Sequence, residues 1–177
     1  ATLFAARHAR SHGVLVSYDP NYREALWSSR EEAVEWMRTP LPLVDIIKLS
    51  DEELPLITGT ADPEEGSRRL ADQGIPLVLI TLGADGAFYR WQGQSGLVSG
   101  VTTFVADTNG AGDTFLGAVL SRLTRRGVRP LEDLTTQELE EILAFANRAA
   151  SKTCSRSGAI PARPTLAEVE DGKETAR

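Results

Sequence analysis

Near the middle of the chain, the stretch DTNGAGD places small residues and a carboxylate at the start of a predicted helix. Gly110, Ala111 and Gly112 leave their backbone N–H groups open to a ligand, and the positive end of a helix dipole favours an anion such as a phosphate. Asp113 follows in the first turn. A carboxylate would repel that anion unless it accepts a proton from a hydroxyl that attacks a phosphoryl group. The stretch therefore indicates phosphoryl transfer, although a glycine-rich turn with Asp113 complementing the dipole would use the same residues.

The helix that follows is specified along one face and at both ends. Apolar residues recur at helical spacing and predict its buried face: Phe115, Leu116, Val119, Leu120 and Leu123. Gly127 suits the position just after the helix. Arginines gather near this end, and we interpret them as a helix C-terminus: Arg122, Arg125, Arg126 and Arg129.

The same stretch, continued by Thr-Phe and a helix of small residues, resembles the second signature of the PfkB, or ribokinase-like, carbohydrate kinases. The resemblance implies that Asp113 is the catalytic base and that the N–H groups of the Gly-Ala-Gly segment form an anion hole for the transferred phosphate. It also implies that Asp107 and Asn109 help to hold a monovalent cation such as K⁺, which would organise the loop.

The segment SYDPNYREALW, residues 17–27, resembles the DPNxRxxLW segment of fructokinases and of 2-keto-3-deoxygluconate kinases. The resemblance places Asp19, Asn21 and Arg23 at the C-terminal end of a strand as substrate-binding residues, where α/β sheets bind ligands. The planar guanidinium of Arg23 could meet a phosphate or an acidic sugar. Asp-Pro-Asn also favours a turn whatever the function, so a plain turn remains an alternative.

KLSDEEL, residues 48–54, resembles the NxxE region of the family. The resemblance implies that Glu53 influences Mg²⁺ and its phosphate-bound water, with Ser50 in the place of the usual asparagine on the cofactor side. Ser50 and Glu53 also have the spacing of a helix capping box, which accounts for the same two residues.

Three later segments resemble the nucleotide side of the family. ITLGADGAFY, residues 80–89, resembles the TLGxxG loop, which implies that Thr81, Gly83 and Gly86 lie against ATP phosphates or ribose; a simple glycine hairpin is the alternative. The helix after residue 135 is implied to contact adenine near Ala146 and Asn147. The closing segment SRSGAIPARP is implied to bind the monovalent cation through backbone carbonyls near Gly158.

Helical and extended segments alternate along the chain, which predicts a parallel sheet. The resemblance implies a three-layer α/β/α ribokinase-like fold with mostly parallel strands. The expected helices are residues 2–11, a helix from Ser29 to Arg38, one from Asp62 that Gly74 ends, and one that Thr135 and Glu138 cap. The expected strands are 14–18, 44–48, 77–81, a return strand to Tyr89, and a strand pair within 91–105.

The bulk properties restrict the class of protein. The 177 residues suit one domain, and a net charge of −6 with scattered Lys and Arg gives no footprint for nucleic acid. The only cysteine, Cys154, excludes an internal disulfide. No apolar run is long enough for a membrane span, so we expect a soluble cytoplasmic protein. His8 and His12 lack partners for a transition-metal site.

The chain opens in a helical pattern without an initiating Met, and it resembles the second half of a PfkB kinase over nearly its whole length. We therefore expect residues 1–177 to be a single nucleotide-binding and catalytic portion, with the N-terminal half and lid absent. Taken alone, such a portion should bind adenine nucleotide weakly, phosphorylate no sugar and self-associate through exposed apolar surface. A homodimer is left open.

The function indicated is ATP-dependent phosphorylation of a sugar hydroxyl, with fructose as the acceptor and Mg²⁺ bridging ATP oxygens. A second hypothesis keeps the mechanism and takes 2-keto-3-deoxygluconate as the acceptor. A third is a non-catalytic nucleotide-binding or scaffold protein, against which Asp113 argues because a scaffold needs no base.

Overall fold

The computed structural model describes residues 1–125, 127 and 131–171. Two of the arginines assigned above to a helix end, Arg126 and Arg129, lie outside these residues. The chain forms two compact units. The first comprises Ala1–Leu82 and Phe88–Leu97, and the second comprises Gly83–Ala87 and Val98–Arg177. None of the helices in the described part of the chain has the length and apolar character to cross a membrane.

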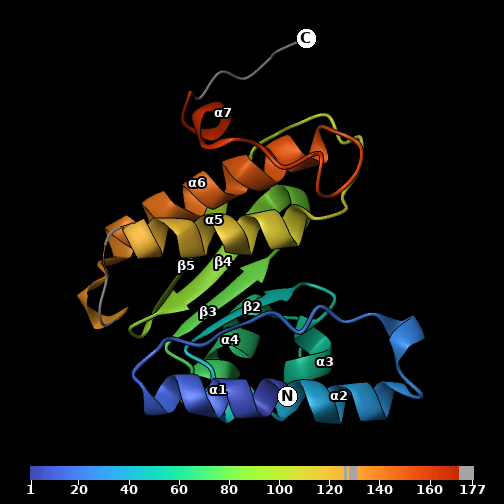
Figure 1. The fold of residues 1–177 in the computed structure, drawn as a ribbon, viewed down its shortest axis with the longest axis vertical. Helices are drawn as coiled ribbons and strands as arrows, with labels where there is room; N and C mark the ends of the chain where they lie inside the picture. The colour runs from blue at the N-terminus through green and yellow to red at the C-terminus, as the bar shows by residue number, and fades with distance from the viewer. Residues whose placement is uncertain (126, 128–130, 172–177) are drawn as a thin grey trace. The chain divides into compact units, whose positions relative to one another are not determined.

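Helices and strands alternate through much of the chain (Figure 1). The helices are α1 (Thr2–Ser11), α2 (Arg30–Arg38), α3 (Leu54–Thr58), α4 (Pro63–Ala71), α5 (Ala111–Arg125), α6 (Thr136–Cys154) and α7 (Leu166–Glu170). Short 3₁₀ turns are η1 (Glu24–Leu26), η2 (Leu41–Leu43), η3 (Gly83–Asp85) and η4 (Leu131–Asp133). The strands are β1 (Ser17–Tyr18), β2 (Ile46–Ser50), β3 (Leu77–Thr81), β4 (Gly86–Trp91) and β5 (Gln94–Ser99).

The five strands form one sheet in the order β1-β2-β3-β4-β5. β1 with β2 and β2 with β3 are parallel, with Ser17 opposite Ile46 and Ile46 opposite Leu77. β4 and β5 are joined by Gln92 and Gly93, whose φ values of 48° and 76° suit the type I′ turn of an antiparallel hairpin. β3 and β4 are joined by residues 82–85 alone, too short for a parallel crossover. The α/β class is confirmed, and the sheet is mixed where we expected mostly parallel strands.

In the first unit, α2, α3 and α4 cover one side of β2 and β3 (Figure 1). Alternate residues of the two strands face these helices, as the two-residue period of a strand requires. The buried residues in this contact include Ala33, Met37, Leu54, Ile57 and Leu70 from the helices and Ile47, Leu49, Val78 and Ile80 from the strands. Two helix starts follow the expected signals, since Ser29 accepts from the Glu32 N–H and Asp62 from the Glu64 N–H.

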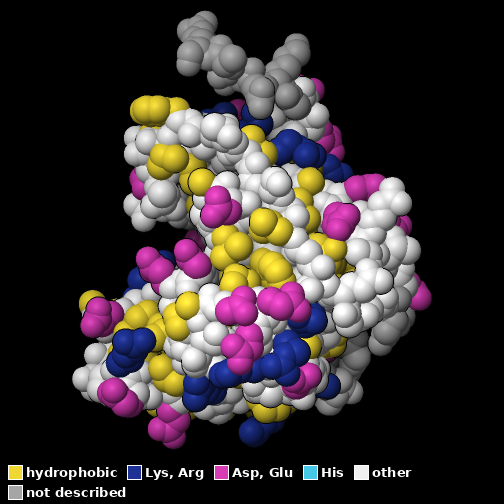
Figure 2. Space-filling view, turned by 180° about the vertical axis from the view of Figure 1, so that it is seen from behind, with side chains coloured by type: hydrophobic (Ala, Val, Ile, Leu, Met, Phe, Trp, Pro, Cys, Tyr) yellow, Lys and Arg dark blue, Asp and Glu magenta, His cyan; other side chains and the backbone are white. Residues whose placement is uncertain are grey.

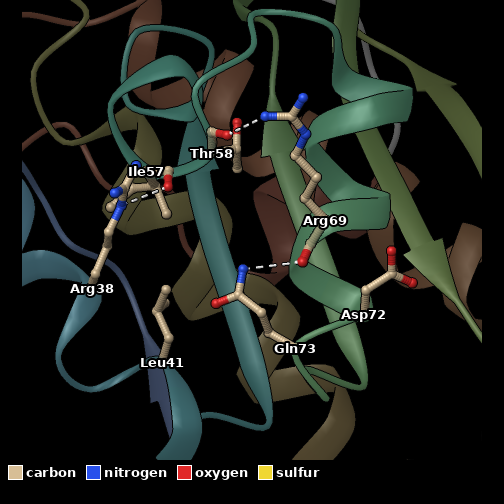
Figure 3. A pocket seen from close by; sticks show the side chains of 7 residues that line it. All are labelled: Arg38, Leu41, Ile57, Thr58, Arg69, Asp72 and Gln73. Carbon is tan, nitrogen blue, oxygen red and sulfur yellow. Dashed lines mark hydrogen bonds between the residues drawn. The ribbon is translucent and has the colours of Figure 1, made fainter.

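The short helix α3 is held at its C-terminal end by arginines from two neighbouring helices (Figure 3). Arg38 Nε donates to Ile57 O at 2.9 Å, and Arg69 Nη1 donates to Thr58 O at 2.8 Å. The last carbonyls of a helix lack partners within it, so these donors compensate them. The same side chains line a cavity of about 470 Å³. A five-residue helix is thereby fixed in place, which matters because Glu53 directly precedes it.

In the second unit, α5 and α6 pack against each other, with Phe115, Val119 and Leu123 buried on α5. The capping box predicted for Thr135 and Glu138 forms with both of its hydrogen bonds. Leu116 and Leu120, also expected in the core, are half-buried. The buried residues of α6 include Leu139, Ile142, Leu143, Ala146 and Ala149, whereas Ala150 is half-buried.

Three of the strand expectations differ from the structure. Of the strand pair expected within 91–105 only one strand forms, β5, and it lies beside β4 in the sheet. The strand expected at 14–18 forms only at Ser17–Tyr18, because the Val16 N–H donates to the Asp45 carboxylate at 2.7 Å instead of to a backbone carbonyl. Val14 and Leu15 are exposed, so no packing extends the strand. The strand expected at 44–48 forms two residues later, at Ile46–Ser50, since Val44 still belongs to the end of η2.

Acidic and basic side chains are interspersed on the face shown in Figure 2. That face therefore lacks the concentrated positive charge with which proteins bind a nucleic-acid backbone. In the part of the chain that the structure describes, no group of three or more His, Cys, Asp or Glu side chains is placed to hold a metal ion.

Candidate active site

The N-terminus of α5 has the geometry that the DTNGAGD stretch predicts. Ala111 N donates to Thr108 O in a turn, and the first helical bond runs from Thr114 N to Gly110 O at 2.9 Å. The N–H groups of Gly112 and Asp113 precede that bond and have no acceptor within the helix. Asp113 is exposed. A carboxylate and backbone donors without an acceptor in the helix therefore lie together in one helical turn.

Gly110 is required by its surroundings as well as by its backbone conformation. Its φ of +79° lies in the left-handed region, which side chains disfavour. A Cβ at this position would also lie 3.1 Å from the Cβ of Ala159, in the segment that follows α6. The C-terminal segment thus packs directly against the loop that begins the helix.

Asp107 ties that loop to the same C-terminal segment. Its Oδ1 accepts from Asn109 N at 2.9 Å, and its Oδ2 accepts from Gly158 N at 3.0 Å. These N–H groups, that of Asn109 first, hold the pKa of Asp107 below its usual value. Cys154 O accepts from the N–H groups of Ala106 and Asp107 at 2.8 and 3.2 Å. The structure therefore brings together Asp107, Asn109 and Gly158, which the sequence associated with one cation site.

The residues expected near adenine on α6 are buried. Ala146 has no exposed surface, so an adenine contact in this region would have to come from its neighbours, and the contact stays a prediction. Asn147 is 7% exposed, and its Nδ2 donates to Val98 O at 2.9 Å and Ser99 O at 3.1 Å. The amide of Asn147 therefore anchors the end of β5 to α6.

The two glycines of the TLGADG loop have different surroundings. A Cβ on Gly86 would lie 2.7 Å from the carbonyl carbon of Ser99 and closer still to Val98 O, so the backbone that follows β5 leaves no room for a side chain. Gly83 is exposed and has open space around the position of a Cβ. Thr81, at the end of β3, directs its hydroxyl to Leu49 O at 3.4 Å. Gly83 thus keeps an open surface, whereas packing explains Gly86.

We expect Gly86→Ala to lower the free energy of unfolding by about 2 kcal/mol or more, because the backbone of residues 98–100 must move and φ is +108°. Gly83→Ala is the matched control: its φ of +57° is also left-handed, but nothing lies in the way. Urea unfolding of the two variants and the wild type measures both effects. Equal losses of stability would contradict the steric argument.

In the first unit, the loop after β1 carries Asp19, Asn21 and Arg23 as predicted. Asp19 Oδ2 lies 3.1 Å from Lys48 Nζ, and Asp19 Oδ1 accepts from Asn21 N at 3.1 Å. Asn21 has a φ of +50°, a left-handed conformation that asparagine tolerates better than most residues. The exposed Arg23 folds back so that its Nη1 donates to Tyr22 O at 2.8 Å.

Glu53 joins this loop to the turn after β2. Its Oε1 accepts from Tyr22 N at 2.7 Å and its Oε2 from Ser50 N at 2.8 Å, while Ser50 Oγ accepts from Glu53 N at 3.2 Å. The reciprocal bonds between Ser50 and Glu53 have the pattern of the capping box expected as an alternative, but they close a turn before α3, whose N-cap is Glu53 itself. Glu53 is only 6% exposed. Its buried carboxylate therefore depends on these backbone donors, one on each oxygen.

Sequence reasoning missed Lys48, which is 6% exposed within β2. The available signal was a lysine inside an otherwise apolar strand, IIKLS. Burial raises the pKa of Asp19 above its usual value, and Lys48 opposes that rise. Burial, and then the charges of Glu53 and Asp19, raise the pKa of Tyr18 to about 12. This region thus holds the buried carboxylate of Glu53, the half-buried carboxylate of Asp19 and the buried ammonium of Lys48.

Comparisons with known proteins agree with this arrangement. The family model described as "pfkB family carbohydrate kinase" matches residues 1–166. The chain is 40% identical over 170 residues to fructokinase-1 of Oryza sativa subsp. japonica, covering 96% of this chain and 52% of that protein. It is 39% identical over 173 residues to the probable fructokinase-6, chloroplastic, of Arabidopsis thaliana, covering 97% and 44%. The chain spans about half the length of these curated relatives.

Solved structures share the fold. The fructokinase of Vibrio cholerae O395, in a form with fructose, ADP and calcium ion bound, matches with a TM-score of 0.87 and 35% identity over 96% of this chain and 54% of that one. The aminoimidazole riboside kinase of Salmonella enterica, complexed with aminoimidazole riboside and an ATP analog, matches with a TM-score of 0.85 and 29% identity over 97% and 56%. These likenesses confirm the fold expected from the resemblance.

Proposed function

Because the chain belongs to the pfkB family of carbohydrate kinases, we propose that the protein transfers the γ-phosphoryl group of ATP to a hydroxyl of fructose. The observation that carries this proposal is the position of Asp113, a carboxylate in the first turn of α5 beside backbone N–H groups without helical partners. A base and an anion-binding helix start in one turn are what phosphoryl transfer to a hydroxyl requires.

In the proposed reaction, Asp113 accepts the proton of the sugar hydroxyl as that oxygen forms a bond to the γ-phosphorus. The bond from the γ-phosphorus to the bridging oxygen breaks, and ADP leaves with that electron pair. Negative charge on the transferring group is stabilised by the N–H groups of the Gly110–Gly112 segment and the first turn of α5, among which that of Ala111 would first have to release Thr108 O. Their fixed orientation means that little reorganisation is needed at the moment of transfer.

The proposed nucleotide surface includes Thr81 and Gly83 of the TLGADG loop, while the buried Gly86 lets the loop pack closely against residues 98–100. Ser50 is proposed on the same cofactor side. Gly83 supports the nucleotide surface because its own surface is open. Mg²⁺, when bound, would neutralise charge on the ATP phosphates. Each oxygen of Glu53 has one backbone donor and retains a second lone pair, so Glu53 can also accept from a water of that ion.

A K⁺ site is proposed where Asp107 and Asn109 meet Gly158. The carboxylate of Asp107 joins the two segments whose backbone carbonyls would bind the ion. Carbonyl and carboxylate oxygens are the ligands that hard cations prefer. A double mutant of the Vibrio cholerae fructokinase carries a potassium ion with fructose and ADP. A cytoplasmic location and a homodimer are also proposed; one plant relative is named as chloroplastic.

A second candidate acceptor is 2-keto-3-deoxygluconate. Arg23 supports it, because its only hydrogen bond within the described residues is to the carbonyl of Tyr22, which leaves guanidinium donors for a carboxylate. Asp19 and Asn21 would contact hydroxyl groups of either sugar. A neutral ketohexose and a sugar acid thus differ in what Arg23 would bind.

We expect the full-length gene product to use fructose with a higher kcat/KM than 2-keto-3-deoxygluconate, because this ratio reports discrimination between competing substrates. ADP release coupled to a reporter enzyme, with each sugar varied at saturating ATP, measures it. A preference for the sugar acid would replace the acceptor and keep the kinase. Nucleotide binding without ADP release for either sugar, or for a wider panel of sugars, would favour the scaffold hypothesis.

A further inference from the structure

Lys48 places an ammonium group where burial of a charge is energetically unfavourable. It lies in the middle of β2 between the fully buried Ile47 and Leu49, and it is 6% exposed itself. Its Nζ donates to Asp19 Oδ2 at 3.1 Å, and the Asp19 side chain is only 13% exposed. Removing both charges from water has a desolvation free energy that an apolar pair at these two positions would not have. Fold stability alone therefore gives no reason for a lysine here.

The partner of Lys48 controls the backbone that follows β1. The Asp19 carboxylate that receives the ammonium on one oxygen receives the Asn21 N–H on the other. Asn21 is in the left-handed region, a conformation that needs a local restraint to persist. Lys48 thus fixes the carboxylate that fixes Asn21.

Glu53 restrains the same loop from a second direction. Its Oε1 accepts from Tyr22 N, one residue beyond Asn21, and its Oε2 is held by Ser50 N at the end of β2. The carbonyl of Tyr22 in turn receives Arg23 Nη1. Residues 19–22 are therefore held at two points by charged side chains, and the direction of Arg23 depends on both.

We propose that Lys48 is a positioning residue for the acceptor: without touching the sugar, it orients Asp19 and holds residues 19–23 in the conformation that binds it. The proposal deepens the proposed function, because residues 19–23 are its acceptor-binding loop. The buried ammonium maintains the conformation of that loop. An apolar residue of similar length could not orient Asp19 in this way.

The test compares Lys48→Met with Arg90→Met in the full-length gene product. Arg90 is a matched control because it is also a buried cation, 8% exposed, and pairs with Glu64 and with Ser67 Oγ at 2.9 Å, between α4 and β4. Both variants remove one buried charge from the first unit. Only Lys48→Met should speed amide hydrogen exchange in peptides covering residues 18–24, by about tenfold or more.

Kinetics supply the second readout. Lys48→Met should raise the KM for the acceptor about tenfold and leave the KM for ATP within about twofold, whereas Arg90→Met should change neither. Wild-type exchange at residues 18–24 in Lys48→Met would overturn the proposal. Faster exchange with an unchanged acceptor KM would also overturn it, because the loop would then not serve the acceptor.

If Lys48→Met does not fold, Lys48→Gln replaces it, since glutamine keeps a hydrogen-bond donor without the charge and should also loosen the loop. The exchange measurement needs no substrate. A protein that phosphorylated no sugar would overturn the proposed function, while the exchange rates would still decide whether Lys48 holds residues 19–23.

Discussion

Asp113→Asn is expected to lower kcat about 10³-fold and to leave the KM for ATP nearly unchanged. Asparagine has the size of aspartate but cannot take up a proton, so the acceptor hydroxyl would attack without a base. Because Asp113 lies at the surface in the first turn of α5, its loss opens no cavity in the core. Steady-state kinetics with fructose and ATP in the full-length gene product provide the measurement.

The matched control is Asp133→Asn, which removes one negative charge from an exposed aspartate in η4 of the same unit. It should have the turnover of the wild type. Thermal unfolding of both variants separates lost catalysis from lost folding. Turnover near that of the wild type in Asp113→Asn would show that another group accepts the proton.

Gly110→Ala is expected to lower kcat about 10²-fold, because a small displacement of a catalytic constellation has an effect of that size. The new Cβ would meet Ala159 at 3.1 Å, so the loop, the C-terminal segment or both must shift. The N–H groups proposed to bind the transferring phosphoryl begin at this residue. Left-handed strain should lower the free energy of unfolding by about 1–2 kcal/mol as well.

Gly127→Ala controls for that strain. Gly127 lies beyond the other end of α5 with a φ of +64°, and nothing lies within 4 Å of the position of a Cβ. Both variants should lose similar stability in urea unfolding, but only Gly110→Ala should lose turnover. If the two had equal turnover, the close approach of Ala159 would not determine the geometry of the helix start.

Much of the local structure could be predicted from the sequence because its causes are local. The helix starts expected at Ser29, Asp62 and Thr135 form where expected, each with a capping side chain. Their hydrogen bonds join residues two or three positions apart, so the separation in the sequence directly indicates the contact. The apolar run at 77–81 predicted β3 with its observed bounds, and four of its five residues are buried.

The chemistry of the second unit was also largely predictable. The residues Gly110 to Asp113 are consecutive, and the helix start that unites them needs no distant partner to be recognised. The family could be inferred from the same stretch and from the other segments that resemble this family. The resemblance placed Ala146 near adenine, but its exposed surface depends on how α6 packs.

Only the tertiary structure decided which distant residues hold the acceptor loop, whereas the resemblance had already associated Asp107 and Gly158 with one cation site. Glu53 meets Tyr22 across 31 residues, Lys48 meets Asp19 across 29, and Gly158 meets Asp107 across 51. None of these pairs has a periodic or capping signal, because the chain between them sets their distance. The burial that makes Lys48 unusual arises from the strands and helices around β2. The sequence by itself determined the local elements and the helix start that carries Asp113, whereas long-range packing decided how the acceptor loop is held.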